Sequence, residues 1–429
     1  MPVHSTIARF RTGFLLEACE DLFYQMVRRL KDAGELSVET VFIDGTKLEA
    51  CANKYTFVWK KSVGKWEEKM FQKIQEAVML LNHEYMQSFS VKIDSGIQDL
   101  QTITRYLENK CQQDGTGFVY GRGKRKSKNQ KYFELFRKFQ ERQVTYDWHT
   151  ASFQGRNNYC KTDPDATFMH MKDDHMRNAQ LKPGYNIQIG VDSEYIVATD
   201  VFSDRNDVWT LIPFLKTMDE KLGFRYPSVT ADSGYESEEG YTYLRETRQT
   251  PYIKPQTYEK WKRRSFKQDI SKRENMAYDA ETDVYTCYAQ KKLSPVFVKK
   301  QKSKSGYESE VTVYECEDCK DCPHKEKCTR AKGNKRLYVS KSFLEKRQES
   351  YENILTETGI QYRMNRSIQV EGAFGVLKND YEFQKFLLRG KTKVKLEILL
   401  LCMGYNLNKL HAKIQNERIG FHLFKVKSA

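Results

Sequence analysis

Two stretches, Ser37-Val38-Glu39-Thr40-Val41-Phe42-Ile43-Asp44-Gly45 and Ser228-Val229-Thr230-Ala231-Asp232-Ser233-Gly234, decide the fold of this chain. Each contains a short apolar run that ends at an aspartate, which is typical of a buried strand, and a nearby glycine lets the backbone turn sharply. A carboxylate at the carboxyl end of a buried strand is held rigidly and faces the crevice in which α/β sheets bind ligands. Asp44 and Asp232 are therefore the first candidates for a functional site.

The segments around these stretches alternate between strand and helix patterns. Residues 185–192 and 195–201 predict a β-hairpin, and residues 207–222 predict an amphipathic helix. This alternation predicts an α/β core with a mixed sheet. Four further aspartates lie near the ends of these elements, and we expect turn residues or helix caps at Asp192, Asp200, Asp204 and Asp207.

Two insertions interrupt the predicted core. Residues 66–110 carry apolar residues at helical spacing and residues 130–144 predict a further helix, so this part is expected to form a helical arm. Residues 257–340 are rich in charged residues and serine, and we expect them to be too polar to form a core of their own. A last helix over residues 393–413 is expected to bury an apolar face made of Leu396, Leu399, Leu400, Met403, Leu407 and Leu410.

These patterns divide the chain into five predicted segments. The start of the core with the first aspartate covers residues 1–60, and the helical arm covers 61–150. Core strands and helices with the second aspartate cover 151–256, and a basic, Cys-rich insertion covers 257–340. Residues 341–429 hold a core helix with a glutamate and the C-terminal helix.

The composition favours a polyanionic partner. Lys and Arg outnumber Asp and Glu by 72 to 57, for a formal net charge of +15, and basic surface releases the counterions that condense on nucleic acid. The sequence has no apolar run long enough to span a bilayer and no signal peptide, so we expect no membrane partner and a cytoplasmic protein. Its ten cysteines are then expected to be reduced.

A third carboxylate, Glu371, lies in a helical pattern over residues 366–378. A buried stripe is expected on one side, and Glu371 shares another side with Ser367, Gly375 and Lys378 at steps of three and four residues. Three convergent carboxylates can hold two Mg²⁺ ions, which activate an attacking oxygen and stabilise a leaving one during displacement at phosphorus. Spacing alone leaves open the alternative that these acids only cap turns.

Four cysteines cluster as Cys316-x2-Cys319-x2-Cys322-x5-Cys328. Four thiolates at such spacing can close around a structural Zn²⁺, and His324 could substitute for one of them. The run Cys322-Pro323 is also similar to an iron–sulfur pattern, and simple reduced thiols are a third alternative. The other six cysteines are expected to be small buried hydrophobic residues.

Basic residues form three tracts. A solvated charge run is the default interpretation of each, and the alternative is contact with DNA phosphates without reading of the base sequence. One tract covers Lys299–Lys304. The candidate DNA-binding residues of the other two are Arg122, Lys124, Arg125, Lys126, Lys128, Lys262, Arg263 and Arg264.

Several motifs in order along the chain resemble the DDE transposases of bacterial insertion sequences, and most closely the group called, in words, the eleven-eighty-two type. These motifs are Phe42-Ile43-Asp44-Gly45-Thr46-Lys47-Leu48-Glu49-Ala50, Thr162-Asp163-Pro164-Asp165-Ala166, Gly184-Tyr185-Asn186-Ile187-Gln188, Ala231-Asp232-Ser233-Gly234-Tyr235, Val370-Glu371-Gly372-Ala373-Phe374-Gly375, Leu387-Leu388-Arg389-Gly390 and Tyr405-Asn406-Leu407.

The resemblance implies a fold and a mechanism. The core would be RNase H-like, and Asp44, Asp232 and Glu371 would be the three acids that hold two Mg²⁺ or Mn²⁺ ions. Lys378 would position a phosphate. The chain would cleave double-stranded DNA at transposon ends and transfer the freed 3′-hydroxyl to target DNA, acting as a homodimer when assembled on DNA.

The sequence departs from the resembled group in two places. Related transposases carry an arginine four residues before the glutamate, where this chain has Ser367, and Arg366 lies one residue further away. The chain also begins near a segment, Pro2–Arg11, that in the group follows a DNA-binding region, so a truncated chain without that region is expected. A non-catalytic DNA-binding remnant, a nuclease that never joins strands, and a zinc-stabilised scaffold that binds RNA are the alternatives.

Overall fold

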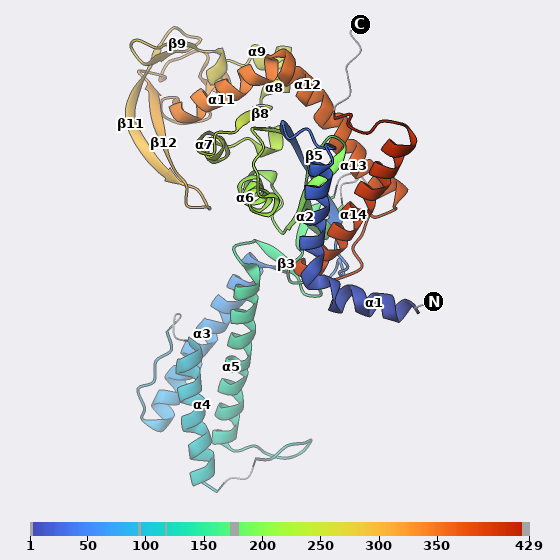
Figure 1. Cartoon of the computed structure of the whole chain (residues 1–429). Helices are drawn as coiled ribbons and strands as arrows, with labels where there is room; N and C mark the ends of the chain where they lie inside the picture. Colours follow the sequence, from blue (N-terminus) through green and yellow to red (C-terminus); the bar gives the residue numbers. More distant parts are fainter. Residues whose placement is uncertain (1–2, 93–95, 116–117, 172–179, 423–429) are drawn as a thin grey trace. The chain divides into compact units, whose positions relative to one another are not determined.

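The computed structural model describes residues 3–92, 96–115, 118–171 and 180–422 and forms two compact units (Figure 1). The first unit holds the ends of the chain and its middle, and the second is inserted within it. The first unit comprises Met1–Leu48, Asn186–Phe386 and Thr392–Ala429, and the second comprises Glu49–Tyr185 and Leu387–Lys391.

A mixed sheet forms the centre of the first unit, which confirms the predicted α/β class. Its strands follow the order β6-β5-β1-β7-β8, in which β1, β7 and β8 are parallel and the β5–β6 hairpin is antiparallel. The predicted hairpin and the strand before Asp232 are both present. The strands are β1 (Thr40–Glu49), β5 (Leu181–Asp192), β6 (Tyr195–Phe202), β7 (Ser228–Ala231) and β8 (Thr250–Ile253).

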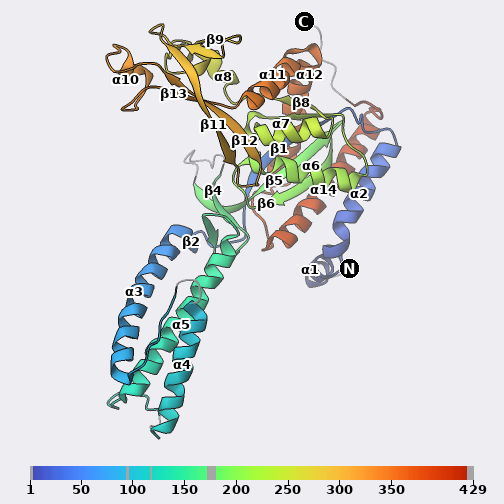
Figure 2. The same cartoon turned by 90° about the vertical axis from the view of Figure 1, so that its left-hand side faces the viewer.

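Helices cover both faces of this sheet (Figures 1 and 2). Helices α6 and α7 lie on one face, and α12 and α14 lie on the other. Because both faces are covered, β5 and β6 are buried along almost all of their length within this unit. The helices of this unit that cover the sheet or flank it are α1 (His4–Gly13), α2 (Leu15–Asp32), α6 (Leu211–Leu222), α7 (Glu238–Glu246), α11 (Lys341–Leu355), α12 (Glu357–Arg366) and α14 (Lys391–Gln415).

The predicted apolar face of α14 is partly wrong. Leu396 and Leu399 are buried as expected, but Leu407 is 59% exposed. Polar side chains point inward instead. Asn406 Oδ1 accepts a hydrogen bond from Ile196 N at 2.9 Å, and its Nδ2 donates to the carbonyl oxygen of the same residue at 2.8 Å. An asparagine can thus be buried here because it satisfies the backbone polar groups of β6.

The insertion over residues 257–340 has a hydrophobic core, contrary to the prediction. Five antiparallel strands form a separate sheet, and the β11–β12 hairpin stands out in Figure 2. Tyr314 and Leu293 are fully buried in its core, together with Cys316. Charged residues occupy the exposed sides of the same strands, so the average polarity of the segment conceals an alternating pattern. The strands are β9 (Ala277–Asp279), β10 (Val284–Thr286), β11 (Lys292–Lys302), β12 (Glu308–Cys316) and β13 (Arg336–Val339).

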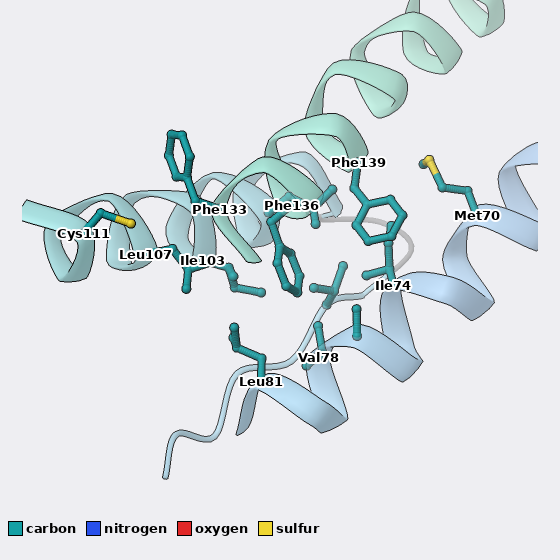
Figure 3. Packing of buried hydrophobic residues seen from close by; sticks show 13 residues of the cluster. Met70, Ile74, Val78, Leu81, Ile103, Leu107, Cys111, Phe133, Phe136 and Phe139 are labelled. Atoms are coloured by element: carbon teal, nitrogen blue, oxygen red, sulfur yellow. The ribbon is translucent and has the colours of Figure 1, made fainter. Parts of the chain in front are cut away.

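The second unit is a helical arm with short strands. Its three long helices are α3 (Lys60–Tyr85), α4 (Gly96–Gln113) and α5 (Lys128–Phe153). The first two divide the pattern predicted over residues 66–110, and α5 extends beyond the helix predicted over residues 130–144. They bury a shared cluster that includes Leu81 and Phe136, both fully buried (Figure 3). The short strands β2 (Phe57–Trp59) and β3 (Asn158–Cys160) pair with each other, and β4 (Thr167–His170) pairs with the first residues of β5. Within the described part of the chain, no helix combines the length and the apolar character that crossing a membrane requires.

Two neighbouring leucines of α3 test the packing of this arm. Leu81 is fully buried, whereas Leu80 is 63% exposed. We expect Leu81→Ala to destabilise the helices by about 2–5 kcal/mol, because it removes buried atoms and leaves a cavity. Hydrogen exchange of residues 60–153 in the full chain measures the effect. Leu80→Ala is the matched control and should change stability by no more than about 0.5 kcal/mol. Equal effects of both substitutions would contradict the packing described here.

Candidate active site

Asp44 and Asp232 lie at the same edge of the central sheet. The parallel strands β1 and β7 pair in a register that places Ile43 opposite Ala231. The next residue on each strand is an aspartate, so the two carboxylates follow a matched pair of backbone positions. The predicted strand end at Asp232 is confirmed, because β7 ends at Ala231. The predicted strand end at Asp44 is wrong, because β1 continues to Glu49 and Gly45 lies within the strand. The pairing of β1 with β7 still brings the two aspartates to the same level of the sheet.

A fourth carboxylate, Asp207, lies beside them, and of its two predicted roles, turn residue or helix cap, the cap is not observed. It begins a short 3-10 helix, Asp207–Trp209, but its side chain makes no cap hydrogen bond there. Its Oδ1 instead accepts hydrogen bonds from Asn186 Nδ2 at 2.8 Å and Gln188 Nε2 at 3.1 Å. A Cβ atom added at Gly45 would lie 2.9 Å from this Oδ1, and one added at Gly234 would lie 3.4 Å from Oδ2. Asp207 therefore occupies the space beside Gly45 of β1 and beside Gly234 in the turn that follows Asp232.

Tyr235 connects these acidic groups. Its side chain is buried, and its hydroxyl donates a hydrogen bond to Gln188 Oε1. Burial raises the pKa of Tyr235 well above its ordinary value, and Asp207, Asp44 and Asp232 raise it further while Arg366 lowers it. The phenol therefore stays protonated, and its hydroxyl remains a donor to Gln188. All three carboxylates thus lie within electrostatic range of the same buried side chain.

Arg366 pairs with Asp44 although it stands one residue away from the position that related sequences use. Its Nη1 lies 3.1 Å from Asp44 Oδ2, and its Nη2 lies 4.0 Å from Glu371 Oε1. Residues Ser367–Glu371 form a π-helical segment, in which backbone hydrogen bonds join residues five apart instead of four. The extra residue in this turn brings Arg366 and Glu371 onto the same side of the helix. The π-helical backbone thus compensates for the one-residue difference in the spacing between the arginine and Glu371.

Glu371 and Lys378 lie along the same helical stretch. The predicted buried stripe beside them is confirmed, because Val370, Ala373 and Leu377 are buried. Glu371 is more open, with 64% of its side chain exposed, and its Oε1 accepts a hydrogen bond from Ser367 Oγ at 3.0 Å. Lys378 belongs to a second π-helical segment, Val376–Asp380, and its Nζ donates to Thr46 Oγ1 on β1. Arg366 and Lys378 therefore attach this helix to β1 on both sides of Glu371.

The chemistry of these side chains suits a hard divalent cation. Mg²⁺ prefers carboxylate oxygens and usually keeps several waters, so it does not need a complete cage of protein ligands. In the described part of the chain, no three acidic, histidine or cysteine side chains already stand as a group that could hold a metal ion. Asp44 instead makes its ion pair with Arg366. The donor set fits Mg²⁺ or Mn²⁺ by its chemistry, and binding would require the side chains to reorient.

The candidate DNA-binding tracts fall in both units, and some of their charges are paired. In the arm, Lys126 and Lys128 form ion pairs with Glu134 and Glu84. Arg122, Lys124 and Arg125 are exposed in the same loop.

In the first unit, Lys262 pairs with Glu259 and lies over the ring of Tyr258, while Arg263 and Arg264 are exposed. The tract Lys299–Lys304 runs along and beyond β11, where Lys300 and Lys302 face Glu310 and Glu308 of β12. Such exposed pairs add little stability, so these lysines can exchange their carboxylate partners for phosphates.

Comparison with known families adds an independent observation. Residues 286–411 match the family described as Transposase DDE domain. This match supports a DDE transposase, an enzyme of the polynucleotidyl-transferase type. The matched stretch contains Glu371, Lys378 and the four clustered cysteines, and Asp44 and Asp232 precede it. A comparison with curated proteins gives no match.

The close packing around Asp207 can be tested at Gly45. A methyl group at this position would press on the Gln188 amide and lie 2.9 Å from Asp207 Oδ1. We expect Gly45→Ala to destabilise the first unit by about 1–3 kcal/mol, as overpacking does elsewhere. Gly375→Ala is the control, because its added methyl group meets no described atom within 4 Å. Thermal unfolding of both variants checks this expectation. An unchanged unfolding midpoint for Gly45→Ala would show that the side chains of Gln188 and Asp207 have room to move.

Proposed function

We propose that this chain is a transposase that cuts DNA and joins the freed 3′-hydroxyl to another phosphodiester, using Asp44, Asp232 and Glu371. The observation that carries the proposal is the adjacency of Asp44 and Asp232 at paired positions of parallel strands, with Arg366 in contact with both Asp44 and Glu371. The strand order of the central sheet supports an RNase H-like core. The match to a transposase domain supports the reaction class.

The chain's own residues have distinct roles in this proposal. Asp44, Asp232 and Glu371 would hold Mg²⁺ or Mn²⁺. When bound, such ions activate an attacking oxygen and stabilise the leaving one. Arg366 offsets the charge of the carboxylates and orients Asp44 through the 3.1 Å contact. Lys378 supplies a second cation on the same helical stretch, where it can attract a DNA phosphate. The partners would be double-stranded transposon ends and target DNA, bound by a homodimer.

Asp207 is proposed as a positioning residue. Both of its hydrogen bonds from Asn186 and Gln188 end on Oδ1. Gln188 in turn accepts from Tyr235, whose ring lies among the acidic residues. Asp207 thus fixes the chain of hydrogen bonds that joins Asn186, Gln188 and Tyr235. It also adds negative charge next to Asp44 and Asp232.

Strand cleavage tests the proposed function directly. The substrate is a DNA fragment that carries the end of the element, with and without Mg²⁺. Asp44→Ala and Asp232→Asn should lower the cleavage rate by about 10³-fold or more, because the loss of several kcal/mol of transition-state stabilisation corresponds to that factor. DNA binding should persist. Asp204→Asn, at an exposed aspartate of the turn after β6, is the control and should cleave normally.

The products of the same reaction distinguish the competing functions. Joined strands support a transposase. Cleavage without joined product would indicate a nuclease of the same fold. A folded chain that binds DNA but shows no cleavage in any variant would overturn the proposal in favour of a non-catalytic DNA-binding remnant.

The role of Asp207 is tested with Asp207→Asn. The new amide oxygen can still accept both hydrogen bonds at Oδ1, so the fold should be retained while one negative charge is lost. We expect an unchanged midpoint of thermal unfolding and a higher Mg²⁺ concentration for half-maximal cleavage. If the Mg²⁺ dependence is also unchanged, Asp207 serves only the packing of this edge of the sheet.

A further inference from the structure

A small cavity in the Cys-rich insertion is lined by more thiols than the cysteine motif contains. Its volume is about 20 Å³. A fifth cysteine, Cys287, lines it beside the four of the motif, although sequence spacing gave no reason to group it with them. The cysteine and histidine residues around the cavity are Cys287, Cys316, Cys319, Cys322, Cys328 and His324, and three lysines, Lys291, Lys325 and Lys335, also line it.

The five cysteines come from different parts of the insertion. Cys287 begins the tight turn between β10 and β11, where Gln290 N donates to its carbonyl oxygen at 2.9 Å. Cys316 ends β12, and Cys328 ends the short helix α10 (Lys325–Cys328). All five are free thiols. A ligand in this cavity would therefore connect the β10–β11 turn to the loop between β12 and β13.

Hydrogen bonds to backbone groups orient two of the thiols at the cavity. The Cys316 thiol donates to the carbonyl oxygen of Asp318, with 3.8 Å between sulfur and oxygen. Cys319 Sγ accepts a backbone hydrogen bond from Lys335 N at 3.4 Å. Such N–H to sulfur contacts orient ligand atoms and stabilise a thiolate.

We propose that this cavity binds one Zn²⁺ ion, with Cys287 as a ligand beside Cys316, Cys319 and one cysteine of the 322–328 loop. Zn²⁺ is held tetrahedrally by thiolates in structural sites, and soft sulfur ligands select it over Mg²⁺. The cavity is small and has room for a single ion. A divalent cation would also offset the repulsion among closely packed thiolates.

Binding would close the loop around the ion. In the described residues, no three of these side chains already stand as a finished ligand group, so the sulfurs must approach one another when the metal enters. Metal affinity and the ordering of this loop are then coupled. The site would fasten the base of the β11–β12 hairpin, because Cys287 precedes β11 and Cys316 ends β12. That hairpin carries most of the basic tract Lys299–Lys304.

Metal analysis of the full chain tests the proposal. Protein purified without chelator should contain about one zinc ion per chain, as structural sites do. After dialysis against a moderate chelator, Cys287→Ser should lose this zinc, whereas the parent should keep it. Cys51→Ser is the control, because Cys51 has the same intermediate exposure but lies in the other unit. Co²⁺ in place of Zn²⁺ should give intense thiolate-to-metal absorption in the parent and weaker absorption in Cys287→Ser.

A second measurement keeps the test valid if Cys287→Ser folds poorly. Zinc added to the metal-free parent should slow hydrogen exchange in residues 287–335 and leave the arm unchanged. Full zinc retention by folded Cys287→Ser would overturn the role of Cys287. Visible absorption from bound iron, or no zinc in the parent and no uptake on titration, would overturn the zinc site itself. None of these results depends on DNA cleavage.

Discussion

The parallel pairing of β1 with β7 is the constraint on which the candidate site depends. It places Ile43 opposite Ala231, and the next residues are Asp44 and Asp232. Because side chains alternate between the two faces of a strand, a slip of one residue would turn one carboxylate to the opposite face. The register is fixed by burial, since Val41, Phe42 and Val229 are fully buried within the unit. The hydrophobic packing of the sheet therefore sets the separation of two acidic side chains that contribute nothing to that packing.

The helix that carries Glu371 has to meet two geometric requirements at once. It must bury Val370 and Leu377 while it brings Arg366 and Lys378 to β1 on both sides of Glu371. A regular α-helix places neighbours three and four residues apart, which would turn an arginine five residues before the glutamate to another side. The π-helical segment adds the missing residue to the turn. Such segments weaken helix geometry and are retained mostly at functional sites, so this one supports a role for the Arg366–Asp44 contact.

Sequence patterns predicted the strands and helices that repeat a simple period, but not the contacts between distant polar residues. The strand end before Asp232 was visible because an apolar run stops there, whereas the same pattern wrongly ended the first strand at Asp44, since β1 continues to Glu49. Asp207 was predicted to be a turn residue or a helix cap, because its partners, Asn186 and Gln188, lie 21 and 19 residues earlier on another strand. Asn406 was missed for the same reason, since only the edge of β6 explains a buried amide on α14. Cys287 lies outside the cysteine motif and is grouped with it only by the β10–β11 turn. Each omission is a polar group whose partner is set by strand pairing, which the local pattern does not contain.

The balance of charge at the site connects its structure to its chemistry. Asp44, Asp207 and Asp232 all act on the buried Tyr235, and Arg366 is the cation that opposes them there. Burying like charges together is costly unless cations or hydrogen bonds compensate. Hydrogen bonds from Asn186 and Gln188 satisfy Asp207, and the ion pair with Arg366 satisfies Asp44. Glu371, which is largely exposed, adds a fourth carboxylate at the open side. In the proposed function, these carboxylates would attract divalent cations and the basic residues beside them would attract a polyanion. A reaction at a DNA phosphate would need both, because the scissile phosphate and the metal ions would have to meet at the same edge of the sheet.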